Sequence, residues 1–280
     1  MARSPPRPLS PGRALTAGAA RAAGAPDPRL FVGALAKGLE VLSAIAAAAR
    51  PVGIPDVVAL TGLDRSAVQR LLYTLRAERF LRQDQRTKRY TLGPRVLDLA
   101  HGFQQGDALR RIALPFLDDL ARRTEETVNL TELDGADVVY VARIGSRHVV
   151  SVDLALGTRL PAWCTGPGRA ILSRVTRPET EQLPPLEPLA ARTPRTVTRR
   201  SEVLRRIARA ARDGFAVNDQ EAFIGDISVA APILDGAGRP VGAINIAVPF
   251  PRWTLKRVTQ SLAPLVVDAA GRISRELSGR

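Results

Sequence analysis

Apolar residues near the start of the chain recur at spacings of three and four, which is the period of a helix. Leu35, Leu39, Leu42 and Ile45 fall on one stripe of such a helix. A proline and a glycine follow shortly afterwards and would end it. A first helix is therefore expected over residues 32–49.

Two shorter helices are predicted next. Pro55 can occupy a first helical position, and Gly62 can adopt the left-handed backbone that ends a helix. Asp64 is a suitable N-cap for the third helix. One face of that helix is apolar, and the opposite face is polar and carries basic and amide side chains. The apolar face comprises Val68, Leu71, Leu72 and Leu75, and the polar face comprises Arg65, Ser66, Gln69, Arg70 and Tyr73.

Two short extended runs follow, at 80–83 and 89–92, and a polar stretch separates them. This pattern predicts a hairpin with a basic tip. Three short helices followed by a basic hairpin are typical of a winged helix-turn-helix. Residues 31–93 include ten basic and five acidic residues. A DNA-binding domain is therefore predicted over residues 31–93.

The polar face of the third helix suits the major groove of DNA. Its arginines would donate to guanine or phosphate, its glutamine would pair with adenine, and its serine and tyrosine would fix the register on the backbone. Basic residues of the wing would contact phosphate or the minor groove. The predicted DNA-binding residues are Arg65, Ser66, Gln69, Arg70 and Tyr73 in the helix and Arg86, Lys88 and Arg89 in the wing.

The rest of the chain predicts a second domain of mixed helices and strands. Pro94 can open a linker helix over 94–106, and another helix carries Leu109, Ile112 and Leu117. The second domain is placed at 107–280, and the whole chain is predicted to be α+β. Strands are expected at 128–133, 138–144, 149–154, 215–218, 227–234 and 240–248, and helices at 166–174, 201–213 and 254–277.

Composition adds a strong positive charge to this pattern. The formal net charge is +14, which points to polyanions as partners. Only Lys37, Lys88 and Lys256 among the 41 basic residues are lysines. A GC-rich genome encodes arginine freely, so charge alone is a weak indication of nucleic-acid binding. The winged motif carries the prediction.

The cysteine content and the N-terminal segment indicate the cellular compartment of the protein. Cys164 is the single cysteine, and the two histidines are His101 and His148, so neither a disulfide nor a zinc site is expected. A reducing, cytoplasmic location is predicted. Residues 1–30 lack a continuous apolar core and are expected to be a disordered tail. No apolar run is long enough for a membrane span.

Candidate catalytic groups are few. Cys164 beside Thr165 suggests a nucleophile with His148 as its base, but a lone buried cysteine is more often a small hydrophobe. No third group is available to orient such a base. Glycines at 236 and 238 lie between predicted strands, where they indicate a hairpin turn. No catalytic residue and no cofactor are expected, and the chain is not predicted to be an enzyme.

Several strings of the sequence, in the same order, resemble the IclR family of bacterial regulators over about residues 31–277. VSVDLALGTRLPAWCTGPGRAIL is most similar to the branch that controls catabolism of protocatechuate, 4-hydroxybenzoate and related aromatic acids. The other matching strings are LAKGLEVLSAI, RSAVQRLLYTLRAERFLRQD, YTLGPRVLDLA, LDGADVVYVARI and DGFAVNDQEAFIGDISVAAPILDGAGRPVGAINIAV.

The resemblance implies a GAF-like α/β effector domain behind the winged helix-turn-helix. It implies a homodimer or homotetramer on palindromic operators, with a small carboxylate as effector, and similarity to the aromatic-acid branch implies an aromatic one. The family pocket lies between the sheet and the helix after LPAWCT. Transferred position by position, and with Trp163 added as an aromatic wall, the effector-binding residues are Leu160, Trp163, Gly166, Pro167, Asn218, Asp226, Ser228, Asn245 and Ala247.

Some of these positions depart from the family pattern. Asn218 replaces an acidic residue and Ser228 a cysteine of the glyoxylate-responding relative. Pro167 has no N–H, so only Gly166 and Gly168 could offer helix amides to a carboxylate. Trp163 is equally compatible with plain core packing.

Two other classes of protein compete with a ligand-responsive regulator. One is an enzyme or ligand-binding domain with an accessory DNA-binding module, which turnover of candidate acids would reveal. The other is a nucleoid-type protein that coats DNA by charge alone. That class predicts a steep salt dependence and almost no preference among DNA sequences.

Overall fold

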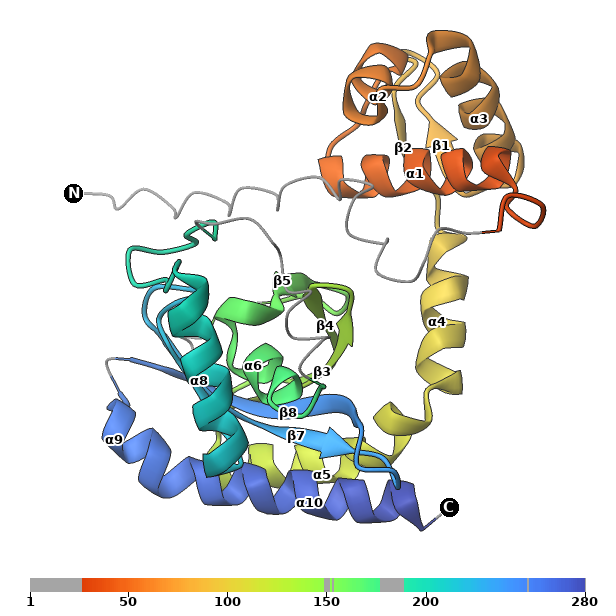
Figure 1. Cartoon of the computed structure of the whole chain (residues 1–280). Coiled ribbons are helices and arrows are strands. Elements are labelled where there is room, and N and C mark those ends of the chain that lie inside the picture. Colours follow the sequence, from red (N-terminus) through yellow and green to blue (C-terminus); the bar gives the residue numbers. More distant parts are fainter. Residues whose placement is uncertain (1–26, 149–151, 153, 177–188, 251, 280) are drawn as a thin grey trace. The chain divides into compact units, whose positions relative to one another are not determined.

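The computed structural model describes residues 27–148, 152, 154–176, 189–250 and 252–279 (Figure 1). The chain divides into two compact units between Phe103 and Gln104. Most of the predicted tail, residues 1–26, lies outside the described residues, as do residues 149–151 and 153 of the predicted strand 149–154. No helix of the described residues is long and apolar enough to cross a bilayer.

The N-terminal unit is a winged helix-turn-helix. Asp64 accepts a hydrogen bond from the Ala67 amide at 2.8 Å and so caps the third helix, as predicted. Gly62 ends the second helix with a φ of +71°, a conformation that glycine adopts without strain. The elements are α1 (Gly33–Ala48), α2 (Ile54–Thr61), α3 (Arg65–Ala77), β1 (Leu81–Gln83) and β2 (Tyr90–Leu92).

A small apolar core holds this unit together. Val41 and Ile45 of α1 pack with Val68 and Leu72 of α3, and Tyr90 of β2 joins them. The helix α4 (Val96–Gly106) follows, and it begins two residues later than Pro94, the predicted start. None of the side chains of α4 is buried.

The C-terminal unit is built on an antiparallel sheet. Among the described residues six strands pair in the order β5-β4-β3-β8-β7-β6. The strands are β3 (Thr127–Asp134), β4 (Asp137–Ile144), β5 (Arg159–Pro161), β6 (Ala216–Asp219), β7 (Asp226–Leu234) and β8 (Pro240–Pro249). The short edge strand β5 was not predicted, and Val152 and Leu154 of the predicted strand 149–154 lie outside any strand.

Helices cover both faces of this sheet. The helices α5 (Ala108–Thr124) and α10 (Ala263–Ser278) pack against one face, while η1 (Ala162–Cys164) and α6 (Gly166–Leu172) pack against the other (Figure 1). The helix α8 (Arg200–Asp213) joins α6 on that second side.

The predicted C-terminal helix 254–277 is interrupted. It consists of α9 (Leu255–Arg257), a π turn, η2 (Val258–Leu262), and then α10. Pro264 lies at the start of α10 and has no N–H to donate within the preceding turn, which accounts for the local widening of the helix.

Alternation along the strands gives the sheet two different faces. On β8, Ile244, Ile246 and Val248 point to α5 and α10 and are fully buried in an aliphatic core. We call this the aliphatic face. The residues between them, such as Asn245 and Ala247, point to the α6 side. We call that side the polar face, because buried asparagine, serine and threonine side chains gather on it.

Candidate functional site

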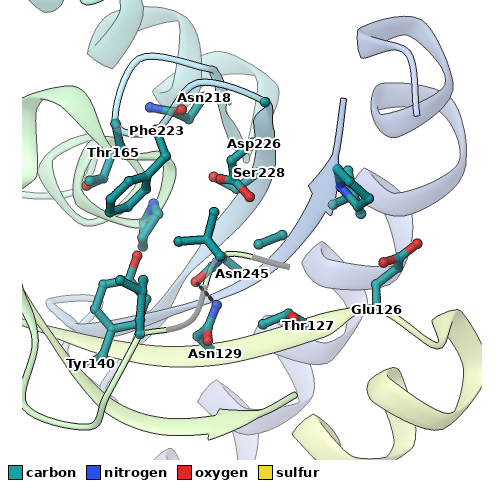
Figure 2. A pocket seen from close by; sticks show the side chains of 18 of the residues that line it. Glu126, Thr127, Asn129, Tyr140, Thr165, Asn218, Phe223, Asp226, Ser228 and Asn245 are labelled. Carbon is teal, nitrogen blue, oxygen red and sulfur yellow. Dashed lines mark hydrogen bonds between the residues drawn. The ribbon is translucent and has the colours of Figure 1, made fainter. Parts of the chain in front are cut away.

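A cavity of about 250 Å³ lies on the polar face (Figure 2). Strands β3, β4, β7 and β8 form its floor, and the start of α6 and the loop after β6 form its walls. Six of the predicted effector-binding residues line it. They are Pro167, Asn218, Asp226, Ser228, Asn245 and Ala247.

Cross-strand pairing brings the polar floor together. Asn129 on β3 lies opposite Arg143 on β4 and opposite Asn245 on β8. Its amide donates to the Asn245 side-chain oxygen at 3.4 Å, and its own oxygen accepts from the Arg143 guanidinium at 3.3 Å. These three side chains form one hydrogen-bonded row across the floor. Ser228 and Asn218 belong to the next row.

A β-bulge on β4 brings two residues to the cavity lining, Tyr140 and Arg143, that the sequence pattern did not predict there. Asn129 pairs with Arg143 and Leu130 with Ala142, but Thr131 pairs with Tyr140, so Val141 has no partner residue. Tyr140 and Arg143 are three positions apart and would face opposite sides of a regular strand. The extra residue puts both on the polar face.

Arg143 is the cationic side chain of the cavity lining, and sequence reasoning missed it. Its guanidinium also donates to the Val152 carbonyl at 2.6 Å. Among the described residues, no carboxylate lies within 4.0 Å of it. The signal that could have found it was an arginine within the apolar run of residues 137–144.

Two lining acids have contrasting surroundings. Glu126 accepts from Trp253 Nε1 at 2.6 Å and pairs with Arg252. The Asp226 side chain accepts no hydrogen bond from any described residue. Burial raises the pKa of Asp226 to about 7, and the charge of Arg143 opposes that rise.

The aromatic walls are not the residue predicted from sequence. Tyr140 and Phe223 line the cavity, whereas Trp163 is 4% exposed and packs in the core under α6. Leu160 packs in the same core and does not line the cavity. Gly166 does not line it either, because its backbone lies against Ser228, 3.0 Å from where a Cβ would be. Leu160, Trp163 and Gly166 therefore do not line this cavity, and their part in effector binding stays a prediction.

The start of α6 also differs from the expected amide site. Thr165 caps the helix and accepts the Gly168 N–H at 3.2 Å, so that amide is already bonded. A Cβ on Gly168 would lie 2.1 Å from the Ala162 carbonyl oxygen, so the glycine is required by close packing. Of the two amides expected to meet a carboxylate, the Gly168 N–H is therefore occupied, and Arg143 is a cation in the cavity lining.

Asn218 and Cys164 are engaged with the backbone. The Asn218 amide donates to the Cys164 carbonyl, and its oxygen accepts from the Glu221 N–H at 3.2 Å. The Cys164 thiol is fully buried, and burial raises its pKa to about 12. It would be protonated at neutral pH and is a poor nucleophile. His148, the suggested base, is exposed.

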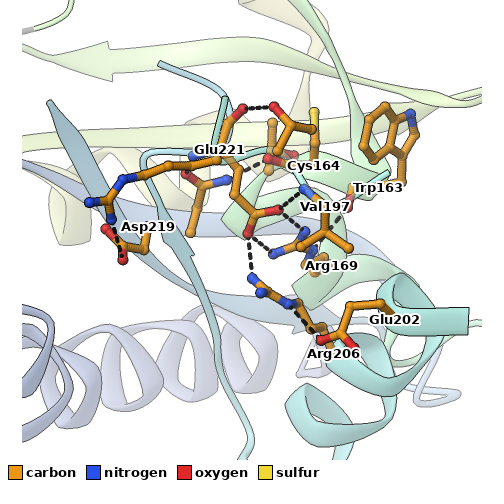
Figure 3. A network of polar contacts seen from close by, with 12 residues as sticks. Trp163, Cys164, Arg169, Val197, Glu202, Arg206, Asp219 and Glu221 are labelled. Carbon is orange, nitrogen blue, oxygen red and sulfur yellow. Dashed lines mark hydrogen bonds and ion pairs between the residues drawn. The ribbon is translucent and has the colours of Figure 1, made fainter. Parts of the chain in front are cut away.

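A buried ion network surrounds Glu221 (Figure 3). Arg169 of α6 and Glu221 are each 1% exposed and form a bidentate pair with distances of 2.6 and 2.7 Å. Arg206 of α8 binds the same carboxylate at 2.6 Å, and the Val197 N–H donates to it at 3.1 Å. The network ties α6, α8 and the loop after β6 together.

In the N-terminal unit the residues predicted to contact DNA are exposed. Arg65, Ser66, Gln69, Arg70 and Tyr73 all lie on the exposed face of α3. Tyr73 stacks with Arg76, whose guanidinium lies 5.8 Å from the ring centre. The rest of the set, Arg86, Lys88 and Arg89, is exposed in the wing.

Arg89 differs from the other wing residues. Its guanidinium donates to the Pro51 carbonyl at 3.0 Å and to Asp56 at 3.3 Å. These contacts fasten the wing to the start of α2. Arg89 therefore has a structural partner, which sequence reasoning did not anticipate.

Comparison with known proteins agrees with this architecture. Residues 103–275 match the family model of the bacterial transcriptional regulator IclR C-terminal domain, and residues 34–85 match the IclR helix-turn-helix domain. The chain is 33% identical over 257 residues to the Pca regulon regulatory protein of Pseudomonas putida, covering 91% of this chain and 87% of that protein.

Solved structures show the same fold. The IclR protein of Thermotoga maritima superposes with a TM-score of 0.66 at 26% identity, covering 88% of this chain and 99% of that one. An IclR homologue of Microbacterium hydrocarbonoxydans, solved in complex with 4-hydroxybenzoate, superposes with a TM-score of 0.72 at 22% identity, covering 87% and 98%.

The curated relatives are transcriptional regulators, which removes the alternative of an enzyme with an accessory DNA-binding module. The fold, the two family domains and the relatives agree with the resemblance read from the sequence. The chain belongs to the IclR family and is a DNA-binding transcriptional regulator with a C-terminal ligand-binding domain.

Proposed function

We propose that this regulator senses a small aromatic carboxylate in the cavity on the polar face and binds a palindromic operator as a homodimer or homotetramer in the cytoplasm. We further propose a DNA-binding domain at 31–93, a linker helix at 94–106 and an effector domain at 107–280. The observation that carries the effector class is Arg143.

An anion that leaves water must recover its charge interactions and hydrogen bonds. Arg143 supplies a guanidinium, which binds carboxylates bidentately, on the floor of the cavity. Asn129 and Asn245 add amide groups beside it. The rest of the proposed contact set comprises Pro167, Asn218, Asp226, Ser228 and Ala247.

Size and wall chemistry favour an effector with one aromatic ring. The cavity volume of about 250 Å³ lies just below the ~300–1,000 Å³ common for drug-sized ligands. Tyr140 and Phe223 offer aromatic surface against which a ring can stack. The name of the Pseudomonas putida relative and the 4-hydroxybenzoate complex of the Microbacterium homologue support the same class.

The DNA contacts proposed here use the exposed polar face of α3 and the wing. Arg65, Gln69 and Arg70 would reach base edges or phosphates in the major groove, with Ser66 and Tyr73 on the backbone. Arg86 and Lys88 would contact phosphates from the wing. Arg89 would act mainly by holding the wing, through Asp56.

A second copy of the chain is the proposed partner of α4. Leu97, Leu99 and Phe103 are 65%, 62% and 50% exposed, which is costly for side chains of this size. Leu99 and Phe103 are one turn apart on the same face of α4, and burial against the same helix of a second copy would cover this pair. A twofold-symmetric dimer reads two half-sites in opposite directions, hence the palindromic operator.

Calorimetric titration tests the effector proposal, with 4-hydroxybenzoate, protocatechuate and β-ketoadipate as probes. Arg143→Met should weaken binding at least about tenfold, because a charge-assisted hydrogen bond is worth roughly 1.5–3 kcal/mol. Ser228→Leu should block the cavity. Arg239→Met, in the exposed β7–β8 turn, is the control and should bind normally. No binding of any acid by wild type would overturn the effector class.

A mobility-shift titration at fixed salt tests the DNA contacts. Arg70→Ala should weaken specific operator binding by about 1–3 kcal/mol, the usual scale for a base contact. Arg239→Ala removes the same charge elsewhere and should change little. Equal operator affinity of Arg70→Ala and wild type would remove Arg70 from the contacts. Binding that does not distinguish operator from random DNA would indicate the nucleoid-type alternative.

A further inference from the structure

The Asp226 carboxylate is an unpartnered acceptor in the effector cavity. It lies at the start of β7 and lines the cavity together with Arg143 and Ser228. Figure 2 shows its oxygens beside Ser228, on the side of the space bounded by Tyr140 and Phe223. None of the described residues donates a hydrogen bond to it. Asp226 is half-buried and open to the cavity, so an effector that displaces water from the cavity without replacing the hydrogen bonds of this carboxylate costs free energy.

The neighbouring side chains do not relieve this cost. Glu126, the other acid of the lining, is paired with Arg252 and Trp253, whereas Asp226 is not paired. The Arg143 guanidinium donates to Asn129 and the Val152 carbonyl and forms no ion pair with Asp226 among the described residues, and it keeps further N–H groups for a ligand. Ser228 lies two residues further along β7, and in the described part of the chain its hydroxyl donates no hydrogen bond to Asp226. The donor that Asp226 lacks can therefore come from the bound effector.

We propose that Asp226 is a specificity-determining residue, which accepts a hydrogen bond from a hydroxyl group on the effector while Arg143 holds the carboxylate of the same molecule. This inference rests on the proposed function, since it assumes an aromatic acid in this cavity. It narrows the effector class to hydroxylated aromatic acids.

The selection follows from hydrogen bonding. Both kinds of acid bring the same carboxylate into the cavity, but an acid without a donor leaves Asp226 without a hydrogen bond. A ring hydroxyl supplies that bond, and bonds to a charged acceptor are about twice as strong as neutral ones. A methyl group of similar size cannot supply it. Sites built to bond a hydroxyl discriminate strongly against analogues that lack one.

Matched ligand pairs test the proposal at pH 8.0, above the pKa of about 7 to which burial raises the Asp226 carboxyl. The probes are 4-hydroxybenzoate against 4-methylbenzoate and 3-hydroxybenzoate against 3-methylbenzoate, titrated calorimetrically into the full chain. Wild type should bind the hydroxylated member of at least one pair about tenfold or more tightly. Asp226→Leu should reduce that preference to below about twofold and should tighten binding of the methyl partner.

Two further variants keep the result interpretable. Asp226→Asn preserves the shape of the side chain and should give an intermediate preference, with thermal unfolding confirming that both variants fold. Asp219→Leu is the control, because Asp219 is opposite Ile227 on the adjacent strand and pairs with Arg195 outside the cavity. Its hydroxyl preference should equal that of wild type.

The possible failures are distinct. If wild type binds acids but does not distinguish hydroxyl from methyl, the role of Asp226 is overturned and the proposed function stands. The same holds if the preference survives in Asp226→Leu. If wild type binds none of the acids, the proposed function fails, and this inference fails with it.

Discussion

The two faces of the effector-domain sheet are made by the same strands but have opposite chemistry. On the aliphatic face, isoleucine, valine and leucine side chains pack against α5 and α10. On the polar face, Asn129, Thr131, Ser228 and Asn245 are buried beneath α6. Adjacent residues of a strand thus serve different purposes. One set supplies stability, and the other gives up apolar burial to hold polar groups for a ligand.

The largest loss of stability is expected from a substitution in the ion network on the α6 side of the sheet. Glu221→Gln would remove the charge that satisfies Arg169, which is 1% exposed. An uncompensated buried arginine costs about 3–5 kcal/mol of unfolding free energy. Urea denaturation should show this loss. Glu202→Gln, a partly exposed partner of Arg206, is the control and should cost less than about 1 kcal/mol. Equal losses would mean that burial of the pair does not matter.

Neighbouring residues of β8 separate the two faces directly. Ile246→Ala on the aliphatic face should cost about 3 kcal/mol of stability, since it leaves a cavity in a fully buried core. Ligand affinity should stay within about twofold. Ala247→Leu on the polar face should instead fill the pocket and abolish effector binding. Calorimetric titration and urea unfolding of both variants provide the test, which fails if Ile246→Ala loses ligand affinity as strongly as stability.

The smallest effect concerns pH. The Asp226 pKa is raised to about 7 in the folded protein from 3.8, so the folded state holds this proton more tightly than the unfolded chain. The contribution of Asp226 to the free energy of unfolding is fully present below pH 3.8 and is lost as the pH rises through 7. The groups facing it are Arg143, Glu126 with its partner Arg252, and the Tyr140 hydroxyl, whose pKa burial raises.

Asp226→Asn should therefore stabilise the protein at pH 8 by on the order of 2 kcal/mol. About half of the full linkage value is expected, because the cavity admits water. The gain should shrink as pH falls from 7 to 5. Thermal unfolding at pH 5 and pH 8 measures it, with Asp219→Asn as control. A pH-independent difference would show that Asp226 is not desolvated.

Local signals made the N-terminal unit predictable. Gly62 ends α2 and Asp64 caps α3, so a few neighbouring residues determine where one helix ends and the next begins. The helical stripe of α1 was only partly right: Ile45 and Leu42 contact the core, whereas Leu35 and Leu39 are 62% and 55% exposed. The interruption before Pro264 was missed, because periodicity alone does not show how a helix accommodates a proline.

The cavity was only partly predictable, for a physical reason. Ser228 and Asn245 came from resemblance, and strand pairing brings them to one face as expected. Trp163 was misplaced because the packing of α6, formed by residues far apart in sequence, buries it. Tyr140 and Arg143 were missed because a regular period of two cannot place both on one face.

The unpaired Val141 bears on how the protein can vary in length. An extra residue at a bulge is absorbed there, so its removal would restore an ordinary ladder without turning Tyr140 or Arg143 away from the pocket. Deletion of a residue at a regular position of the strand would instead turn the residues beyond it to the other face. An aromatic and a basic residue can therefore lie two or three positions apart on this strand and still line the same cavity.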